Sequence, residues 1–208
     1  MTRVLERAAA LQRMEGQLLE GVVFAATRFS AIVQVDTQEH ERRHQVRLAS
    51  VGSAELLEVL ARLPHGLAVP WSAIDPIEAA VLDVAPPGVI EASPTHMRRL
   101  WRPAVAVTGV LVIDEQAARG LDAASLFAPD ARRCLVAHTD RGLSQKLVDE
   151  AKELGVGVVR ATGQDCEVIA HAPATVPARV SARHWRFLET VYDRWLLTEG
   201  HISAQASR

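Results

Sequence analysis

The sequence is poor in cysteine and in aromatic residues, and it contains no long apolar run. Cys134 and Cys166 are its two cysteines, too few for a disulfide framework, which indicates reduced thiols in a cytoplasmic protein. No segment approaches the ~18 consecutive apolar residues that a membrane span requires. Residues 1–21 form a charged amphipathic pattern without the apolar core of a signal peptide. We therefore expect a cytoplasmic protein that does not enter a membrane.

The sequence also lacks an excess of either charge. Its formal net charge is −2 at pH 7, which gives no global attraction to nucleic acid or to an anionic membrane. Any nucleic-acid role would need local basic patches. The 49% of hydrophobic residues and 208-residue length suit one large globular domain or two small ones.

Residues 105–173 carry the clearest pattern, in which apolar, β-branched segments alternate with amphipathic ones. Continuous apolar strands separated by helices are typical of a partly parallel sheet covered on both faces. Gly155 predicts a helix end, because glycine adopts the left-handed C-terminal position without penalty. This part is therefore predicted to be α/β, with a mixed, partly parallel central sheet flanked by helices. The expected strands are 105–113, 133–137, 156–160 and 167–171, and the expected helices are 115–126 and 143–154.

The first half has a weaker pattern and predicts an α+β arrangement. Thr2 can cap an amphipathic first helix, and Ser53 opens a second helix that must stop before Pro64. The other expected elements are one or two strands in 22–36, a polar turn at 37–44, a short strand at 45–51 and a loop with a short strand or helix in 65–82.

Proline and glycine residues suggest how the chain is divided. Residues 85–88 (APPG) form the best candidate boundary, and a proline-punctuated connector precedes a last helix at 184–198. The predicted parts are an α+β N-terminal part at 1–87, an α/β core at 88–178, and a C-terminal helix and tail at 179–208, which can also form one continuous domain.

One segment matches a metallopeptidase pattern. His40-Glu41-Arg42-Arg43-His44 fits H-E-x-x-H, in which two histidines bind zinc and the glutamate activates the bound water. That chemistry needs a helix buried against the enzyme core, whereas the neighbours here are polar. We therefore predict a solvated hairpin loop and keep a zinc peptidase as a minor hypothesis.

Basic and aromatic residues cluster in two places, around Trp101 and around Trp185 and Trp195. On a helix, Trp185, Leu188, Tyr192 and Trp195 share one face, which either docks on the core, leaving the arginines in solvent, or accompanies a phosphate-binding surface. The C-terminal helix is thus a candidate contact for nucleic acid or a partner protein. The candidate contact residues are Arg98, Arg99, Arg102, Arg183, Arg186 and Arg194.

The distal half resembles a known superfamily. VTGVLVIDEQ at 107–116, AKELGVGVV at 151–159 and CEVIAHAP at 166–173 resemble the second half of restriction-endonuclease-like, PD-(D/E)xK, domains. The resemblance implies a strand bearing an E-x-K pair, a helix packed across the sheet, a buried strand and a helix that ends in a glycine turn. In that family carboxylates hold Mg²⁺ and a lysine activates the attacking water. Here Leu111 and Ile113 stand at the Glu and Lys positions, so the resemblance implies the fold more than the activity.

Three functional hypotheses follow. The leading one is a non-catalytic nuclease-fold protein, without a cofactor, that acts as a nucleic-acid-associated or defence-system accessory subunit and can form homo-oligomers. The second is an active Mg²⁺-dependent nuclease that uses Asp75 and Glu91, with Ser93 where the lysine belongs. The third is the zinc peptidase through His40, Glu41 and His44.

Overall fold

The chain folds into two compact units, and each is built from two separate stretches of sequence. The computed structural model describes residues 1–128, 130–139, 142–174 and 181–206. The first unit comprises Met1–Gln34 and Ala106–Ala178, and the second comprises Val35–Val105 and Arg179–Arg208. The boundaries predicted after residues 87 and 178 stay predictions, and the second of them lies outside the described residues.

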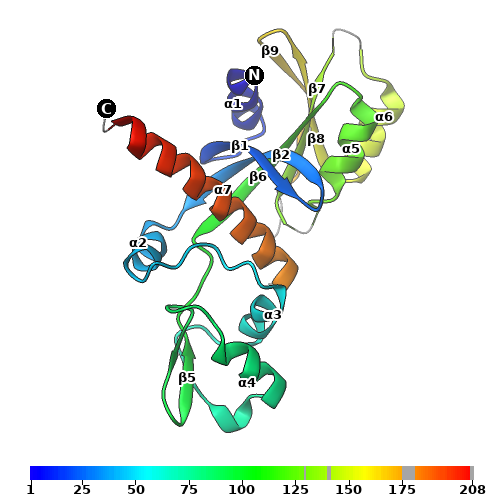
Figure 1. Ribbon diagram of the computed structural model, residues 1–208. Helices are drawn as coiled ribbons and strands as arrows, with labels where there is room; N and C mark the ends of the chain where they lie inside the picture. Colours follow the sequence, from blue (N-terminus) through cyan, green and yellow to red (C-terminus); the bar gives the residue numbers. More distant parts are fainter. Residues whose placement is uncertain (129, 140–141, 175–180, 207–208) are drawn as a thin grey trace. The chain divides into compact units, whose positions relative to one another are not determined.

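A six-stranded sheet forms the centre of the first unit (Figure 1). The strand order is β1-β2-β6-β7-β8-β9. β6, β7 and β8 run parallel, whereas β1 with β2 and β8 with β9 are antiparallel pairs. The predicted α/β class with a mixed, partly parallel sheet is thus confirmed. The strands are β1 (Gln17–Phe24), β2 (Thr27–Val35), β6 (Val105–Asp114), β7 (Arg132–His138), β8 (Val156–Thr162) and β9 (Asp165–Ala170).

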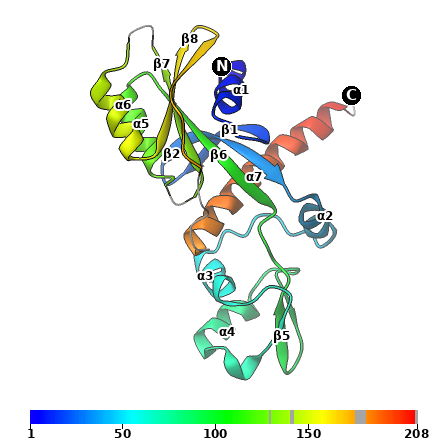
Figure 2. The ribbon, with the colours of Figure 1, turned by 180° about the vertical axis from the view of Figure 1, so that it is seen from behind.

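Helices cover both faces of this sheet (Figures 1 and 2). The buried residues of α1 (Thr2–Leu11) pack in one core cluster with Leu111, Cys134 and Val159 of three neighbouring strands. α5 (Ala117–Ser125) and α6 (Gln145–Glu153) lie on the opposite face. Both faces of the parallel strands are therefore buried, which explains their continuous apolar sequences.

Local signals set the ends of α6. The hydroxyl of Ser144 accepts a hydrogen bond from the backbone N–H of Leu147, which caps the N-terminus. At the other end Gly155 has a φ of +65°, a left-handed conformation that glycine adopts at no steric cost. The predicted helix end at Gly155 is confirmed, and β8 begins at the next residue.

The second unit combines helices with a small antiparallel sheet of order β3-β5-β4. Ser53 caps α3 as predicted, since its hydroxyl accepts from the N–H of Leu56. The N–H of Asp36 donates to the carbonyl of Ala104 at 2.8 Å, so the two ends of the stretch between β2 and β6 are tied together. The elements are α2 (Thr37–Gln45), α3 (Ala54–Arg62), β3 (Ala68–Pro70), a 3₁₀ turn (Trp71–Ala73), α4 (Pro76–Asp83), β4 (Ile90–Ala92), β5 (His96–Arg99) and α7 (Ala182–Ala206).

Two predictions for residues 37–51 are wrong. The segment expected to be a polar hairpin turn is the helix α2, and the segment expected to be a strand at 45–51 contains the end of that helix followed by irregular backbone. The carboxylate of Asp36 accepts from the N–H of Glu39 at 3.0 Å and caps the helix. The helix is stabilised by ion pairs rather than by an apolar face, and for this reason hydrophobic periodicity did not reveal it.

The C-terminal helix is present and longer than predicted. α7 extends over Ala182–Ala206, whereas the sequence pattern predicted 184–198. Within the part of the chain that the structure describes, no helix has both the length and the apolarity needed to cross a membrane.

Candidate functional site

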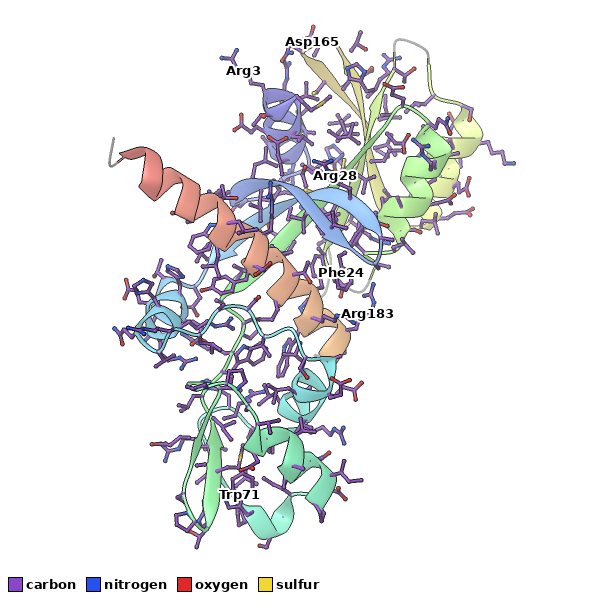
Figure 3. All side chains as sticks on the ribbon, viewed as in Figure 1. Arg3, Phe24, Arg28, Trp71, Asp165 and Arg183 are labelled. Carbon is purple, nitrogen blue, oxygen red and sulfur yellow. The ribbon has the colours of Figure 1, made fainter. Side chains whose placement is uncertain are left out.

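The predicted apolar face of α7 is buried, and the predicted arginines lie on its other side. Trp185 packs edge-on against Trp101, with ring centroids 4.7 Å apart. The buried set is Trp185, Leu188, Tyr192 and Trp195. In contrast, Arg183, Arg186 and Arg194 are exposed, and Arg183 is labelled in Figure 3. The structure therefore agrees with the first interpretation in that the aromatic face of α7 belongs to the core, and its three arginines are exposed on the other side.

Arg99 and Arg102 are engaged within the second unit. The half-buried Arg99 donates to the carbonyl of Leu60 at 2.7 Å, and its guanidinium lies 5.0 Å from the ring centroid of Trp185. Burial lowers the pKa of Arg99. Arg102 forms an ion pair with Asp36 at 2.9 Å. Both arginines stabilise their surroundings, so phosphate binding would require them to give up these contacts.

The remaining arginine of that cluster is paired with a nuclease candidate. Arg98 on β5 lies 3.4 Å from the carboxylate of Glu91 on β4, and both side chains are exposed. Asp75 caps α4 by accepting from the N–H of Ile77 at 2.8 Å. Thus Glu91 has a cation partner and Asp75 has a structural role at a helix N-terminus.

The two positions that the resemblance assigns to metal chemistry border a cavity in the first unit. Leu111 and Ile113 of β6 line a space of about 230 Å³ together with Glu20, Arg28 and Ser30 of the β1–β2 hairpin. Leu111 is fully buried. A hard cation prefers oxygen ligands, and the strand offers two apolar side chains there. The position of Arg28 can be followed in Figure 3.

Asp114 ends β6 and is bound by an arginine. Its carboxylate accepts from Arg119 at 2.7 and 2.9 Å and from the N–H of Gln116 at 2.8 Å. The hydrogen bond from Arg119 is the main reason that the pKa of Asp114 is lowered; partial burial opposes it and the Gln116 N–H supports it. An ionised Asp114 is therefore already neutralised by Arg119.

We expect Arg119→Gln to raise the pKa of Asp114. A lowered carboxyl pKa adds stability above the pKa of the unfolded chain, and this is lost as pH falls through the lower pKa of the folded state. The stability difference between wild type and variant should therefore shrink between about pH 5 and pH 2. Carboxyl NMR titration and urea unfolding measure the two effects. Lys152→Gln, which removes an exposed contact to Asp149, is the control, and an Asp114 titration unchanged by Arg119→Gln would rule out this cause.

The most polar buried cluster of the second unit was not predicted from the sequence. Arg43 of α2 is 0% exposed, and Glu39 and Glu189 are each 2% exposed. Arg43 binds Glu189 in a bidentate manner at 2.9 and 3.0 Å and Glu39 at 3.0 Å, and it donates to the carbonyl of Arg102 at 2.6 Å. Glu189 also accepts from the N–H of Val51 at 2.5 Å. We call Glu39, Arg43 and Glu189 the buried triad.

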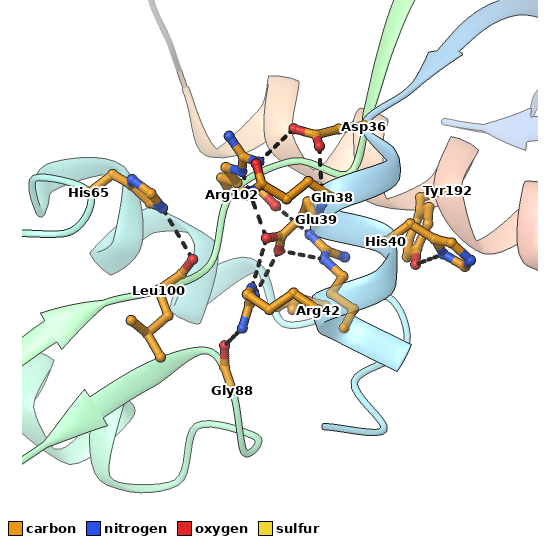
Figure 4. Close-up of polar contacts among 12 residues, drawn as sticks. Asp36, Gln38, Glu39, His40, Arg42, His65, Gly88, Leu100, Arg102 and Tyr192 are labelled. Atoms are coloured by element: carbon orange, nitrogen blue, oxygen red, sulfur yellow. Dashed lines mark hydrogen bonds and ion pairs between the residues drawn. The ribbon is translucent and has the colours of Figure 1, made fainter. Parts of the chain in front are cut away.

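Neighbouring groups complete this network (Figure 4). Arg42 donates to both carboxylate oxygens of Glu39 at 2.7 and 2.8 Å and to the carbonyl of Gly88 at 2.8 Å. The guanidinium of Arg43 also lies 4.9 Å from the ring centroid of Tyr192. With so many partners, the triad fixes α2 against α7 and is itself unavailable as a catalytic acid or base.

The two carboxyl groups of the triad have opposite pKa shifts. Burial acts to raise the pKa of Glu39, but hydrogen bonds from Arg42 and Arg43 outweigh it, so the pKa is lowered. Burial is the larger effect at Glu189, and its pKa is raised despite Arg43 and the Val51 N–H. Arg42 and Arg43 both donate hydrogen bonds to Glu39, and Arg102 lies 3.7 Å from it, whereas Glu189 receives its arginine hydrogen bonds from Arg43, so burial prevails at Glu189.

A local signal for this cluster does exist in the sequence. Asp36 and Glu39 stand three residues apart, the spacing of a helix capping box, and Glu39 and Arg43 are spaced for an ion pair on a helix. No local pattern identifies Glu189, which lies 146 residues beyond Arg43.

The H-E-x-x-H segment lies on α2 rather than in the predicted loop. His40 and His44 are one turn apart, with ring centroids separated by 6.5 Å, and Glu41 is exposed. The Nδ1 atom of His40 is 3.0 Å from the hydroxyl oxygen of Tyr192 (Figure 4). Among the described residues, no three His, Cys, Asp or Glu side chains are grouped so that they could hold a metal ion.

Comparisons with known proteins identified no relative of this chain. No protein-family model matches the chain, and searches of curated proteins and of solved structures found no similar protein.

Proposed function

We propose that this protein is a non-catalytic member of the restriction-endonuclease-like fold, and that it binds nucleic acid as an accessory subunit. The order of elements in the first unit supports the fold. β6 is followed by α5 packed on the sheet, by the buried strand β7, and by α6, which ends at Gly155. This is the succession that the resemblance of residues 105–173 implies.

The residues on β6 carry the non-catalytic part of the proposal. The resemblance aligns Leu111 and Ile113 with the metal-binding carboxylate and the lysine, and both residues line the same cavity. The lysines of the chain are Lys146 and Lys152, both on α6, which lies on the face of the sheet opposite to α1 and this cavity. A cavity without the carboxylate pair and the lysine cannot assemble the metal-dependent chemistry of the family.

The exposed side of α7 supplies the proposed contact surface, which we define as Arg183, Arg186 and Arg194. With a rise of about 1.5 Å per residue, the first and last of these are about 16 Å apart along the helix. Arginine binds phosphate oxygens through several donors at once. Because the net charge of the chain is −2, affinity for nucleic acid must come from such a local surface.

Titration of labelled single- and double-stranded DNA and RNA at several salt concentrations tests this proposal. We expect salt-dependent binding, and the triple variant Arg183→Gln/Arg186→Gln/Arg194→Gln should bind more weakly and lower the slope of log K against log[salt] by about 2 to 3. The matched control changes three exposed arginines outside α7 and outside the candidate contact set, Arg7, Arg62 and Arg119, to glutamine. Absence of binding, a slope near zero, or an equal loss in the control would refute the proposal.

The enzyme hypotheses make different predictions for the same protein preparation. An active nuclease would cleave supercoiled plasmid with Mg²⁺ or Mn²⁺ and lose activity in Asp75→Ala and Glu91→Ala, whereas our proposal predicts no cleavage. A zinc peptidase would contain stoichiometric zinc that His44→Gln removes, and metal analysis of the purified protein decides this point.

A further inference from the structure

A second cavity lies within the second unit, and its lining combines cationic with apolar groups. It has a volume of about 340 Å³ and is bordered by α2, by the turn that follows α2, and by α7. A volume of this size holds about ten water molecules, or a ligand of one aromatic ring with a charged substituent. It is also within the size range of ligand sites.

The polar part of the lining is basic. His40 and His44 contribute imidazoles from successive turns of α2, and the exposed Arg47 lies just beyond the helix end. Arg43 borders the cavity too, but Glu39 and Glu189 balance its charge. Within the described part of the chain no carboxylate lines this space, so the excess charge comes from Arg47, with the imidazoles adding hydrogen-bond donors.

The remaining wall is apolar and rigid. Leu48, Ala49 and Leu196 line the cavity, together with Tyr192. The hydroxyl of Tyr192 is held by His40, and its ring stacks near Trp195 with centroids 5.9 Å apart. The backbone also fixes the rim, because Arg47 has a φ of +56° and the N–H of Leu48 donates to the carbonyl of Arg43 at 2.8 Å.

From this lining we infer a binding site for a small organic anion, a carboxylate or phosphate group on a single ring or short apolar body. The anionic group contacts Arg47 and His44, and the apolar body packs on Leu48, Leu196 and the ring of Tyr192. This site is distinct from the arginine surface of α7, which uses residues that do not line the cavity.

Isothermal titration calorimetry with phenyl phosphate, benzoate and benzyl alcohol tests this inference on the full chain. We expect saturable binding of at least one of the two anions and much weaker binding of the neutral alcohol. Arg47→Gln and His44→Gln should weaken anion binding, the former about ten-fold, the loss expected for a charge-assisted hydrogen bond. The relative affinities of the two anions distinguish a phosphate site from a carboxylate site.

The control is Arg186→Gln, which removes an exposed arginine of α7 that does not line the cavity. It should leave phenyl phosphate and benzoate binding unchanged, and Arg47→Gln should leave nucleic-acid binding unchanged. Both variants alter exposed side chains, so thermal unfolding should match wild type. Lack of saturable binding of either anion, equal affinity for the alcohol, or equal losses in Arg47→Gln and Arg186→Gln would overturn the inference.

Discussion

Replacing Arg43 by methionine is expected to lower the free energy of unfolding by about 3–5 kcal/mol, because it leaves two buried carboxylates without their cation. Glu39 keeps Arg42 and Arg102 as partners, whereas among the described residues Glu189 keeps the N–H of Val51 as its partner. Urea unfolding followed by tryptophan fluorescence measures the loss. Because Glu189 loses both of its hydrogen bonds to the guanidinium, most of the lost stability should arise at Glu189.

The pH dependence and a surface control make this prediction specific. Without Arg43, burial raises the pKa of Glu189 further, so the folded variant binds a proton more readily than the unfolded chain. Stability then falls as pH rises, and the deficit relative to wild type should be smaller at pH 5 than at pH 7. Arg98→Met removes an exposed ion pair and should cost at most about 1 kcal/mol. If Arg43→Met costs no more than this control, the triad does not stabilise the fold.

Gly157→Ala is expected to destabilise the first unit by about 3 kcal/mol, although it adds a single methyl group. A Cβ atom at Gly157 would lie 2.7 Å from the backbone nitrogen of Ala172 and 2.8 Å from Oε1 of Gln12. The buried side chain of Gln12 accepts from Ala172 N–H at 2.7 Å and donates to the carbonyl of Ala170 at 2.9 Å. The methyl group would force these atoms apart and break buried hydrogen bonds.

Gly52→Ala serves as the matched control for this substitution. An added Cβ at Gly52 meets no atom within 4 Å, so the change should stay within about 0.5 kcal/mol of wild type. Chemical denaturation of both variants provides the comparison. If the Gly157 and Gly52 variants are equally stable, the backbone around Ala172 can shift to accept the methyl group without loss of stability, and the prediction is wrong.

The sequence predicted the elements whose signals are local. β7, α6 and β8 follow one another with a serine cap, a glycine end and continuous apolar strands, and each lies within a few residues of its predicted range. α2 was missed because it has no apolar face and because its partner Glu189 is distant in sequence, although Asp36 and Glu39 carry a local capping signal. The pairing of β2 with β6 and the discontinuous units involve residues distant in sequence, which periodicity does not report.

The candidate sites divide in the same way. The buried aromatic face of α7 and its exposed arginines could be predicted because helical spacing separates them. The contacts of Arg99 with Leu60 and of Arg102 with Asp36 could not be predicted, because these partners are distant in the sequence. The cavity near Arg47 could not be predicted either. It is formed in part by a left-handed turn after α2, and the residue with positive φ there is an arginine, not the glycine or asparagine that usually indicates such a turn.

The interleaved units constrain the order in which the protein can fold during its synthesis. β2 cannot pair with β6 until about 70 further residues have been made, and Arg43 waits for Glu189, 146 residues later. At about 5–20 residues per second, the ribosome takes on the order of ten seconds to supply that partner. During this interval α2 carries an arginine without its second carboxylate, and the second unit cannot close, whereas the chain of the first unit is already complete at residue 178. α7 completes the second unit, so a truncation that removes Glu189 and the residues after it should deprive Arg43 of its bidentate partner and the second unit of Tyr192 and Trp195 from its core.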